Sequence, residues 1–451
     1  MIDHVYLGCL LLWVAVGVLA YLKTASPHWS GAGLSLTFFA SLALNHWFGA
    51  LVCALPWYTP EAGWTTVDLG FKLSTVGIAA FAIGCYGVAP LLTRSCHPGN
   101  SRLLPSPPLI LKGFFGAGLA CYLAMALGAK RIPSMTAVLS TGFNLVFVSI
   151  CLGLWDASVL GNRKQLGVLL VVTLVLPFFT VLTQGFLGYG VTELILVLSF
   201  FVMLYKHRLR LLLALLPLMF VALSFFVSYM RNRSDIRAAV WEGRDYSARI
   251  EPVLRTCRSV EWFNPWDTGH LRPIDDRLNQ NSLIGAAIQR FDLTGHRAHG
   301  ETIWMSVLAL IPRAIWPEKT VSAGSMNLVS EYTGIVFAEG VSVGMGTVFE
   351  FYINYGTWGV IGGLLLMGAV IGVADRKAGY ALRSGSVFDF AKWFLIGICL
   401  LSSTVGSLVE VTPGVVTAVV LTVLLRGVMG REPAAEAFEA MPHEPGDAVN
   451  L

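Results

Sequence analysis

Arginine is the dominant charged residue of one long stretch, residues 231–300. This stretch contains no lysine and eleven arginines, namely Arg231, Arg233, Arg237, Arg244, Arg249, Arg255, Arg258, Arg272, Arg277, Arg290 and Arg297. The planar guanidinium group binds a phosphate through two parallel hydrogen bonds, whereas lysine is a strongly hydrated point charge. The bias therefore indicates a phosphorylated ligand, although we expect acidic residues of the stretch to pair with most of these arginines. Arg231 and Arg233 are better candidates because they directly follow an apolar run, near the plane of lipid phosphates.

A second group of charged residues lies around the apolar run 301–317. Arg290 and Asp292 precede this run, Glu301 begins it, and Arg313 lies within it. An arginine in an apolar run is costly, so by default it faces a cavity or a partner and marks a functional site. The alternative is a side chain that extends to the membrane surface.

Glu350 is the best candidate for proton transfer. It lies about one turn into another apolar run and is followed by Tyr352 and Asn354, whose side chains can bond hydroxyl groups. Burial or an arginine partner suits such a carboxylate to proton transfer. The alternative, a structural glutamate that pairs with Arg313 or caps a helix, remains open.

The histidines of the same region do not indicate a metal site. His296 and His299 are three residues apart and lack the glutamate of a metalloprotease helix. We therefore expect no metal and no other cofactor.

Long apolar runs must position all these residues. Of the 451 residues, 55% are hydrophobic and 13% are charged, against roughly 25% charged in an average soluble domain, which excludes a water-soluble globule. A membrane-spanning helix needs about 20 apolar residues. Such runs lie at residues 4–22, 31–55, 71–92, 109–129, 137–155, 166–183, 187–205, 211–230, 347–374, 389–409 and 411–427, the last two separated by a turn at 410–413. The predicted fold is an all-α polytopic membrane protein with about 11 transmembrane helices.

Loop charges predict the topology, because short cytoplasmic loops collect lysine and arginine. Basic residues mark every second loop, at Lys23, Arg94, Arg102, Arg163, Lys164, Lys206, Arg208, Arg210, Arg376, Lys377, Arg383 and Lys392. This parity places the N-terminus and residues 231–300 outside and the C-terminus in the cytoplasm. With this topology the run 301–317 cannot cross the membrane, and we expect it to be re-entrant or interfacial. Lys130 and Arg131 are the exception to the pattern.

Four regions follow from this topology. They are an N-terminal transmembrane bundle of about eight spans (1–230), an outer arginine-rich loop (231–346), the C-terminal transmembrane helices (347–430) and a cytoplasmic tail (431–451). The tail is expected to be disordered because its composition cannot bury a core. We refer to residues 231–346 as the outer segment.

The candidate residues also carry a resemblance to a known family. The order RFD (290–292), IPRAIWPEKT (311–320) and, after a glycine-rich turn, GTVFEFYINYGTWG (346–359) resembles the Wzy-type oligosaccharide repeat-unit polymerases. These are the O-antigen and exopolysaccharide polymerases of bacterial inner membranes. The resemblance covers roughly residues 230–376.

The resemblance implies a GT-C-like glycosyltransferase that joins undecaprenyl-pyrophosphate-linked repeat units on the periplasmic face, with the outer segment as its periplasmic loop. Implied roles are catalytic for Glu350, Asp292 and Glu301, pyrophosphate-binding for Arg231, Arg233, Arg290 and Arg313, and sugar-binding for Tyr352, Asn354 and His296. Arginines suit the negative charge of a pyrophosphate leaving group without a metal. Implied partners are the lipid-linked oligosaccharides, membrane lipid, a chain-length regulator and a flippase, and no nucleic acid.

Two alternatives remain open from the sequence. An O-antigen-ligase-like enzyme would share the pyrophosphate-linked donor and differ in its acceptor. A lipid-linked oligosaccharide flippase or other transporter would more often carry charges along a cavity at mid-membrane, and it would seldom need a long outer segment.

Overall fold

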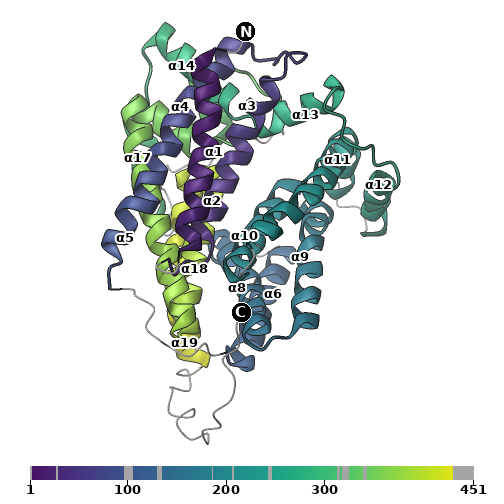
Figure 1. Cartoon of the computed structure of the whole chain (residues 1–451), viewed down its shortest axis with the longest axis vertical. Coiled ribbons are helices and arrows are strands. Elements are labelled where there is room, and N and C mark those ends of the chain that lie inside the picture. The colour runs from purple at the N-terminus through teal and green to yellow at the C-terminus, as the bar shows by residue number, and fades with distance from the viewer. Residues whose placement is uncertain are drawn as a thin grey trace, which may run out of the picture.

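The computed structural model of the chain describes residues 3–26, 29–95, 105–128, 135–184, 186–205, 208–241, 246–311, 315–316, 325–338 and 343–429. Every regular element within these ranges is a helix (Figure 1). In chain order the elements are α1 (His4–Ala25), α2 (Leu34–Leu42), η1 (Ala43–Trp47), α3 (Phe48–Cys53), α4 (Trp64–Ile83), η2 (Gly84–Val88), α5 (Ala89–Leu92), α6 (Pro108–Ala126), α7 (Met135–Phe143), α8 (Leu145–Val159), α9 (Arg163–Gln184), α10 (Leu187–Leu204), α11 (Arg208–Trp241), α12 (Tyr246–Arg258), α13 (Thr268–Leu278), α14 (Asn281–Thr294), α15 (Glu301–Ala309), α16 (Ser325–Thr333), α17 (Thr347–Arg383), α18 (Val387–Leu401), η4 (Ser402–Thr404) and α19 (Leu408–Met429).

Ten helical stretches of the described residues are long and apolar enough to cross a membrane. The chain is thus a multi-pass helical membrane protein, as its composition predicts. Ten is one fewer than the eleven runs expected. The difference lies in α10, whose apolar part, Gly190–Leu204, is shorter than the other ten.

Some helix limits differ from those predicted by hydropathy. Helix α4 begins at Trp64, seven residues before the predicted run, and α19 begins at Leu408. The chain therefore turns between η4 and α19 and not at residues 410–413. Pro413 lies inside α19, in its second turn, where it has no backbone N–H to donate to the carbonyl of Val409 four residues earlier.

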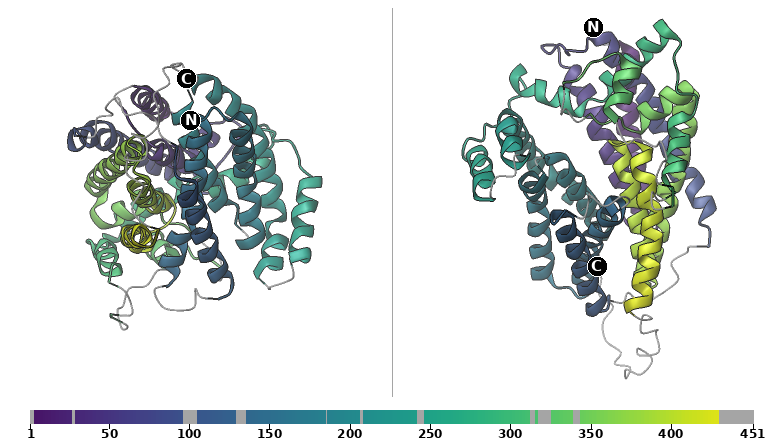
Figure 2. Two further views of the ribbon diagram at one scale, coloured as in Figure 1. Left: turned by 90° about the horizontal axis from the view of Figure 1, so that it is seen from below. Right: turned by 180° about the vertical axis from the view of Figure 1, so that it is seen from behind.

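The helices form two groups that diverge toward one end of the molecule. In Figures 1 and 2, α1 to α5 and α17 to α19 lie on one side, and α9 to α12 lie on the other. Helix α17 packs along α4 and α18, whereas α10 joins the two groups through α2 and α8. The long helix α17 thus forms the centre of the first group.

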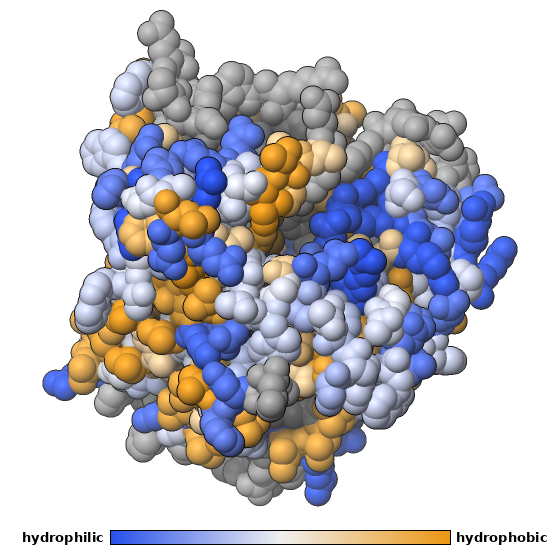
Figure 3. All heavy atoms as spheres, turned by 90° about the horizontal axis from the view of Figure 1, so that it is seen from above, coloured by the Kyte–Doolittle hydropathy of each residue, from blue (hydrophilic) through white to orange (hydrophobic). Residues whose placement is uncertain are grey.

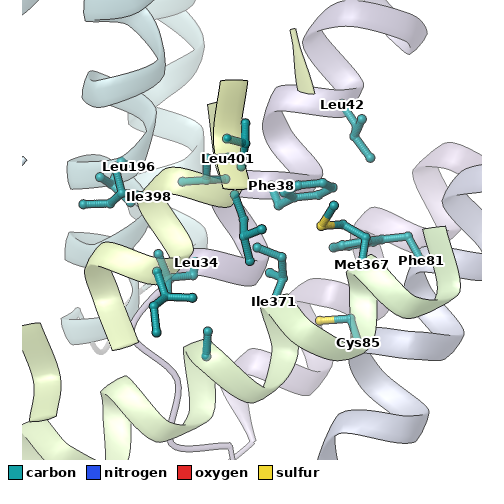
Figure 4. Close-up of a cluster of buried hydrophobic side chains, with 14 of the residues drawn as sticks. Leu34, Phe38, Leu42, Phe81, Cys85, Leu196, Met367, Ile371, Ile398 and Leu401 are labelled. Carbon is teal, nitrogen blue, oxygen red and sulfur yellow. The ribbon is translucent and has the colours of Figure 1, made fainter. Parts of the chain in front are cut away.

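The core of the first group is built from large apolar side chains of helices that are distant in sequence. Figure 4 shows residues of α2, α4, α17 and α18 converging with Leu196 of α10. The rings of Phe38 and Phe81 stack with centroids 4.9 Å apart. These contacts fix the position of α17, which carries Glu350.

The start of α1, α13 and α14 lie at one end of the molecule, and the end of α19 lies at the other (Figures 1 and 2). Figure 3 looks onto the first end and shows mostly hydrophilic residues with apolar patches between them. The loop before α4 meets the outer segment there, because Trp57 donates a hydrogen bond from Nε1 to the carbonyl of Pro265 over 2.9 Å. The loop before α4 and the outer segment therefore lie together at this end.

The run 301–317 begins as a short helix. Helix α15 has nine residues, which at about 1.5 Å per residue is too short to cross a bilayer. It packs against α19 and α17, and the hydroxyl of Thr412 donates a hydrogen bond to the carbonyl of Ser306 over 2.8 Å. The described part of the run is thus held against the transmembrane helices.

The outer segment is anchored by a close approach of α14 to α4. A methyl group added to Gly70 or Gly285 would collide with the backbone of the other helix, at Asn281 and Thr66 respectively. The buried side chain of Asn281 accepts a hydrogen bond from Ser74 over 3.0 Å and donates one to the carbonyl of His46 over 2.7 Å. Small residues and a buried amide thereby fix α14 to the bundle.

Candidate functional site

Glu350 lies in the first turn of α17 and is completely buried. Its Oε2 accepts a hydrogen bond from the backbone nitrogen of Leu408, the first residue of α19, over 2.8 Å. A carboxylate at a helix N-terminus is stabilised by the free N–H groups of the first turn. Its Oε1 is buried without a hydrogen-bond partner among the described residues. Because an unpaired buried polar atom is costly, we regard this oxygen as the best candidate to receive a ligand's proton.

Two oxygen-bearing side chains lie beside the Glu350 carboxyl group. They are Thr302 on α15, whose hydroxyl lies close to the carboxyl group without forming a hydrogen bond of normal geometry to Oε1, and Glu410 on α19. Glu410 is exposed, and its Oε1 accepts a hydrogen bond from the Ser325 hydroxyl over 3.4 Å. The carboxyl of Glu350 therefore lies where α15, α17 and α19 meet.

Asn354 links α17 to the start of α15. Its side-chain nitrogen donates hydrogen bonds of 2.7 Å to the hydroxyl of Thr302 and to the carbonyl of Glu350, and its side-chain oxygen accepts one of 2.9 Å from the backbone nitrogen of Gly300. The residue is buried, so these bonds use its polar atoms within the protein. The structure thus gives Asn354 a positioning role next to Glu350.

Helix α17 is broken directly after Asn354. Tyr355 has non-helical dihedral angles, and Gly356 has φ 62° and ψ −149°, a region that is essentially restricted to glycine. The carbonyl of Ile353 accepts a hydrogen bond of 2.9 Å from the backbone nitrogen of Ala298. The loop between α14 and α15 therefore fits against the break and satisfies a carbonyl beside it.

Arg297 holds this loop against α17. Its guanidinium group lies 3.8 Å from the centroid of the Phe291 ring and 5.7 Å from that of Tyr352. It also lies against Gly356, where a side chain would collide with it. A planar cation between aromatic rings is a geometry that lysine cannot reproduce.

His296 occupies the rim of the same site. It is exposed, its Nε2 lies 3.0 Å from Oε1 of Glu331, and its ring is stacked on Tyr332 with centroids 5.0 Å apart. His296, Arg297, Tyr332 and Tyr352 line a small depression together with residues of α14. Burial raises the pKa of Tyr332 to about 12, so its hydroxyl stays protonated.

The structure brings seven of the ten predicted site residues to one corner. Glu350, Tyr352 and Asn354 lie on α17, and the exposed residues Arg290, Asp292, His296 and Glu301 surround them on α14, the following loop and α15. Arg290 lies beside Gly334, next to α16. We refer to residues 290–302 and 350–356 as the Glu350 corner.

Arg231 and Arg233 lie elsewhere, on α11 in the second helix group. Arg231 pairs with Glu261 over 2.6 Å, and Arg233 faces Arg277 of α13. No contact of these two arginines with the Glu350 corner is seen in the described residues. Arg313 lies outside the described residues.

Sequence reasoning did not single out Arg297 or Asn281 as positioning residues. Arg297 was one of many arginines in the stretch, and its partners come from two helices. Asn281 pairs with His46 and Ser74, which are more than 200 positions away in the sequence, so no local sequence pattern predicts these contacts.

Comparisons with known proteins give one family match. No curated protein and no solved structure matches the chain. Residues 110–389 match the family described as a domain of unknown function (DUF8712), and this region includes all ten predicted site residues. Because the match covers more than half of the 451 residues, the chain belongs to the DUF8712 family.

Proposed function

We propose that this protein is a membrane glycosyltransferase that joins undecaprenyl-pyrophosphate-linked oligosaccharide repeat units on the periplasmic face of a bacterial inner membrane. The proposal combines the resemblance of residues 290–359 to repeat-unit polymerases with the arrangement of the Glu350 corner. An acid, exposed charged residues and aromatic rings meet there at one end of a multi-pass bundle.

The observation that carries the proposal is the buried, unpartnered Oε1 of Glu350. In the proposed reaction the acceptor hydroxyl oxygen attacks the anomeric carbon of the donor glycan. The bond from that carbon to the pyrophosphate oxygen breaks, and the lipid pyrophosphate leaves with the electron pair. The hydroxyl proton passes to Oε1 of Glu350 and then to water. A base held in place by Leu408 needs little reorganisation for this step.

Charge on the leaving pyrophosphate requires cationic groups nearby. Arg290 and Arg297 are the described arginines of the corner, and Arg290 is exposed. We assign pyrophosphate binding first to Arg290, because Arg297 is already packed between two rings. Arg231 is a weaker candidate because its guanidinium group pairs with Glu261.

The test is an assay of purified protein in nanodiscs with lipid-linked repeat units as the only substrate. Glycan ladders longer than one unit are expected, and they should disappear with Arg290→Ala. Arg272→Ala is the matched control, because Arg272 is an exposed arginine of α13 that pairs with Glu61 in the loop before α4. Transfer only to a lipid A core or a protein acceptor would identify a ligase instead, and translocation without glycan growth would identify a flippase.

A further inference from the structure

Helix α12 has one face on the protein and one face outside it. On its inner face Val253 is buried against α11, and Thr256 accepts a hydrogen bond of 3.2 Å from the side chain of Asn232. On its outer face Ile250 and Leu254 are 40% and 46% exposed. Apolar side chains one turn apart form a stripe on a helix surface. The stripe is unexplained by packing within the protein.

Two arginines border this apolar stripe. Arg255 and Arg258 are exposed, and together with Ile250, Leu254, Glu251 and Ser259 they line a groove of about 460 Å³. Arg255 forms an exposed ion pair with Glu251 over 3.3 Å, which is a weak interaction in water. No acidic side chain in the described part of the chain pairs with Arg258. The groove thus combines positive charge with an apolar wall.

The segment that follows α12 lies against the apolar part of α11. Trp262 is 65% exposed, and its ring stacks on Phe220 with centroids 5.9 Å apart and an angle of 6° between the planes. Phe220 lies inside the predicted span 211–230, so this segment runs from the end of α12 along the apolar part of α11. In Figure 1 helix α12 lies on the outside of the second helix group, beside α11.

Helix α12 meets α11 at Asn232, just beyond the predicted span 211–230, so its basic and apolar groove lies where lipid headgroups are expected. We propose that α12 and the segment after it bind an acidic membrane phospholipid, with the phosphate on Arg255 and Arg258 and an acyl chain along Ile250 and Leu254. Guanidinium groups bind phosphate through paired hydrogen bonds, and arginines near the membrane surface attract anionic lipids. The site is separate from the Glu350 corner, so the lipid-binding proposal does not depend on the proposed glycosyltransferase activity.

The experiment titrates delipidated full-length protein with phosphatidylglycerol or phosphatidylcholine and counts bound lipids by native mass spectrometry. The wild type should prefer phosphatidylglycerol. Arg255→Gln with Arg258→Gln should weaken that binding by about fivefold for each arginine. The double lysine variant, Arg255→Lys with Arg258→Lys, should keep only part of the preference, because it keeps the charge and loses the paired hydrogen bonds to phosphate. Arg272→Gln is the matched control and should behave as the wild type.

Three results would overturn the proposal. The first is an unchanged lipid preference in the double glutamine variant that elutes as a folded protein. The second is equal binding of phosphatidylcholine. The third is displacement of phosphatidylglycerol by inorganic phosphate at the same ionic strength, which would identify a site for free phosphate. To test the apolar wall, Ile250→Gln with Leu254→Gln should weaken binding of phosphatidylglycerol more than binding of glycerol phosphate.

Discussion

The carboxylate of Glu350 accepts a hydrogen bond of 2.8 Å from the backbone nitrogen of Leu408, which ties the start of α17 to the first residue of α19. The other carboxylate oxygen has no partner among the described residues. One side chain therefore offers a structural bond and an open proton acceptor. Substitutions at this position must separate these two roles.

Glu350→Gln is expected to abolish chain growth and preserve the fold. The glutamine oxygen can still accept the bond from Leu408, but the amide does not take up a proton at neutral pH. We expect ladder formation to fall by at least about 100-fold, the usual size of a general-base contribution. The measurement is initial polymerisation rate, with thermal unfolding in detergent as the check on folding.

Glu410→Gln is the control, since it removes a neighbouring exposed carboxylate. Normal growth in Glu350→Gln together with loss in Glu410→Gln would transfer the base assignment to Glu410.

Gly356→Ala should destabilise the protein, whereas Gly362→Ala should not. Gly356 has a positive φ in a region essentially closed to alanine, and an added methyl group would meet Arg297. The expected loss is about 1–3 kcal/mol of unfolding free energy. Gly362 lies on the same helix with open space around it, so alanine there is neutral or favourable. Denaturant unfolding in mixed micelles compares the two, and equal effects would show that the break at Gly356 is not required.

Asn354→Ala and Thr302→Val should act on stability non-additively. Each removes the 2.7 Å bond between the two side chains, and leaving a buried polar group unpaired costs about 1–3 kcal/mol. The double variant should therefore lose less than the sum of the two single losses, with a coupling of about 0.5–3 kcal/mol. Strict additivity in a double-mutant cycle would contradict the bond.

The pair of Arg231 and Glu261 should make stability depend on acid pH. The hydrogen bond from Arg231, and then that from His270, holds the pKa of Glu261 below its ordinary value of 4.5. A lowered folded pKa stabilises the protein above the ordinary value, and this contribution disappears as the pH falls through the folded pKa. Glu261→Gln should thus lower the unfolding temperature slightly at pH 7 and have no effect near pH 3. The effect is small because the pair is exposed. If wild type and Glu261→Gln differ in unfolding temperature by the same amount at pH 7 and pH 3, the ion pair does not contribute to the pH dependence of stability.

Much of the fold could be predicted from the sequence because the bilayer constrains each span locally. A run of apolar residues long enough to cross must form a helix whose backbone groups bond within the run. Ten long apolar helices confirm this prediction. The predicted ends of the helices were less accurate. Helix α11 continues eleven residues beyond Met230, the end of the predicted run, because hydropathy reports where a chain leaves the apolar layer and not where its helical hydrogen bonds end.

The candidate site was predicted from sequence only in part. Glu350 stood out because an acid at the start of an apolar run is costly, and that cost is visible in the sequence itself. Its bond to Leu408, the break at Gly356 and the packing of Arg297 join residues from separate helices. Likewise, eleven arginines in one stretch indicated a phosphorylated ligand, but the tertiary structure placed Arg231 and Arg290 in different helix groups. Residue type determines what chemistry a side chain can perform, whereas helix packing decides which side chains meet.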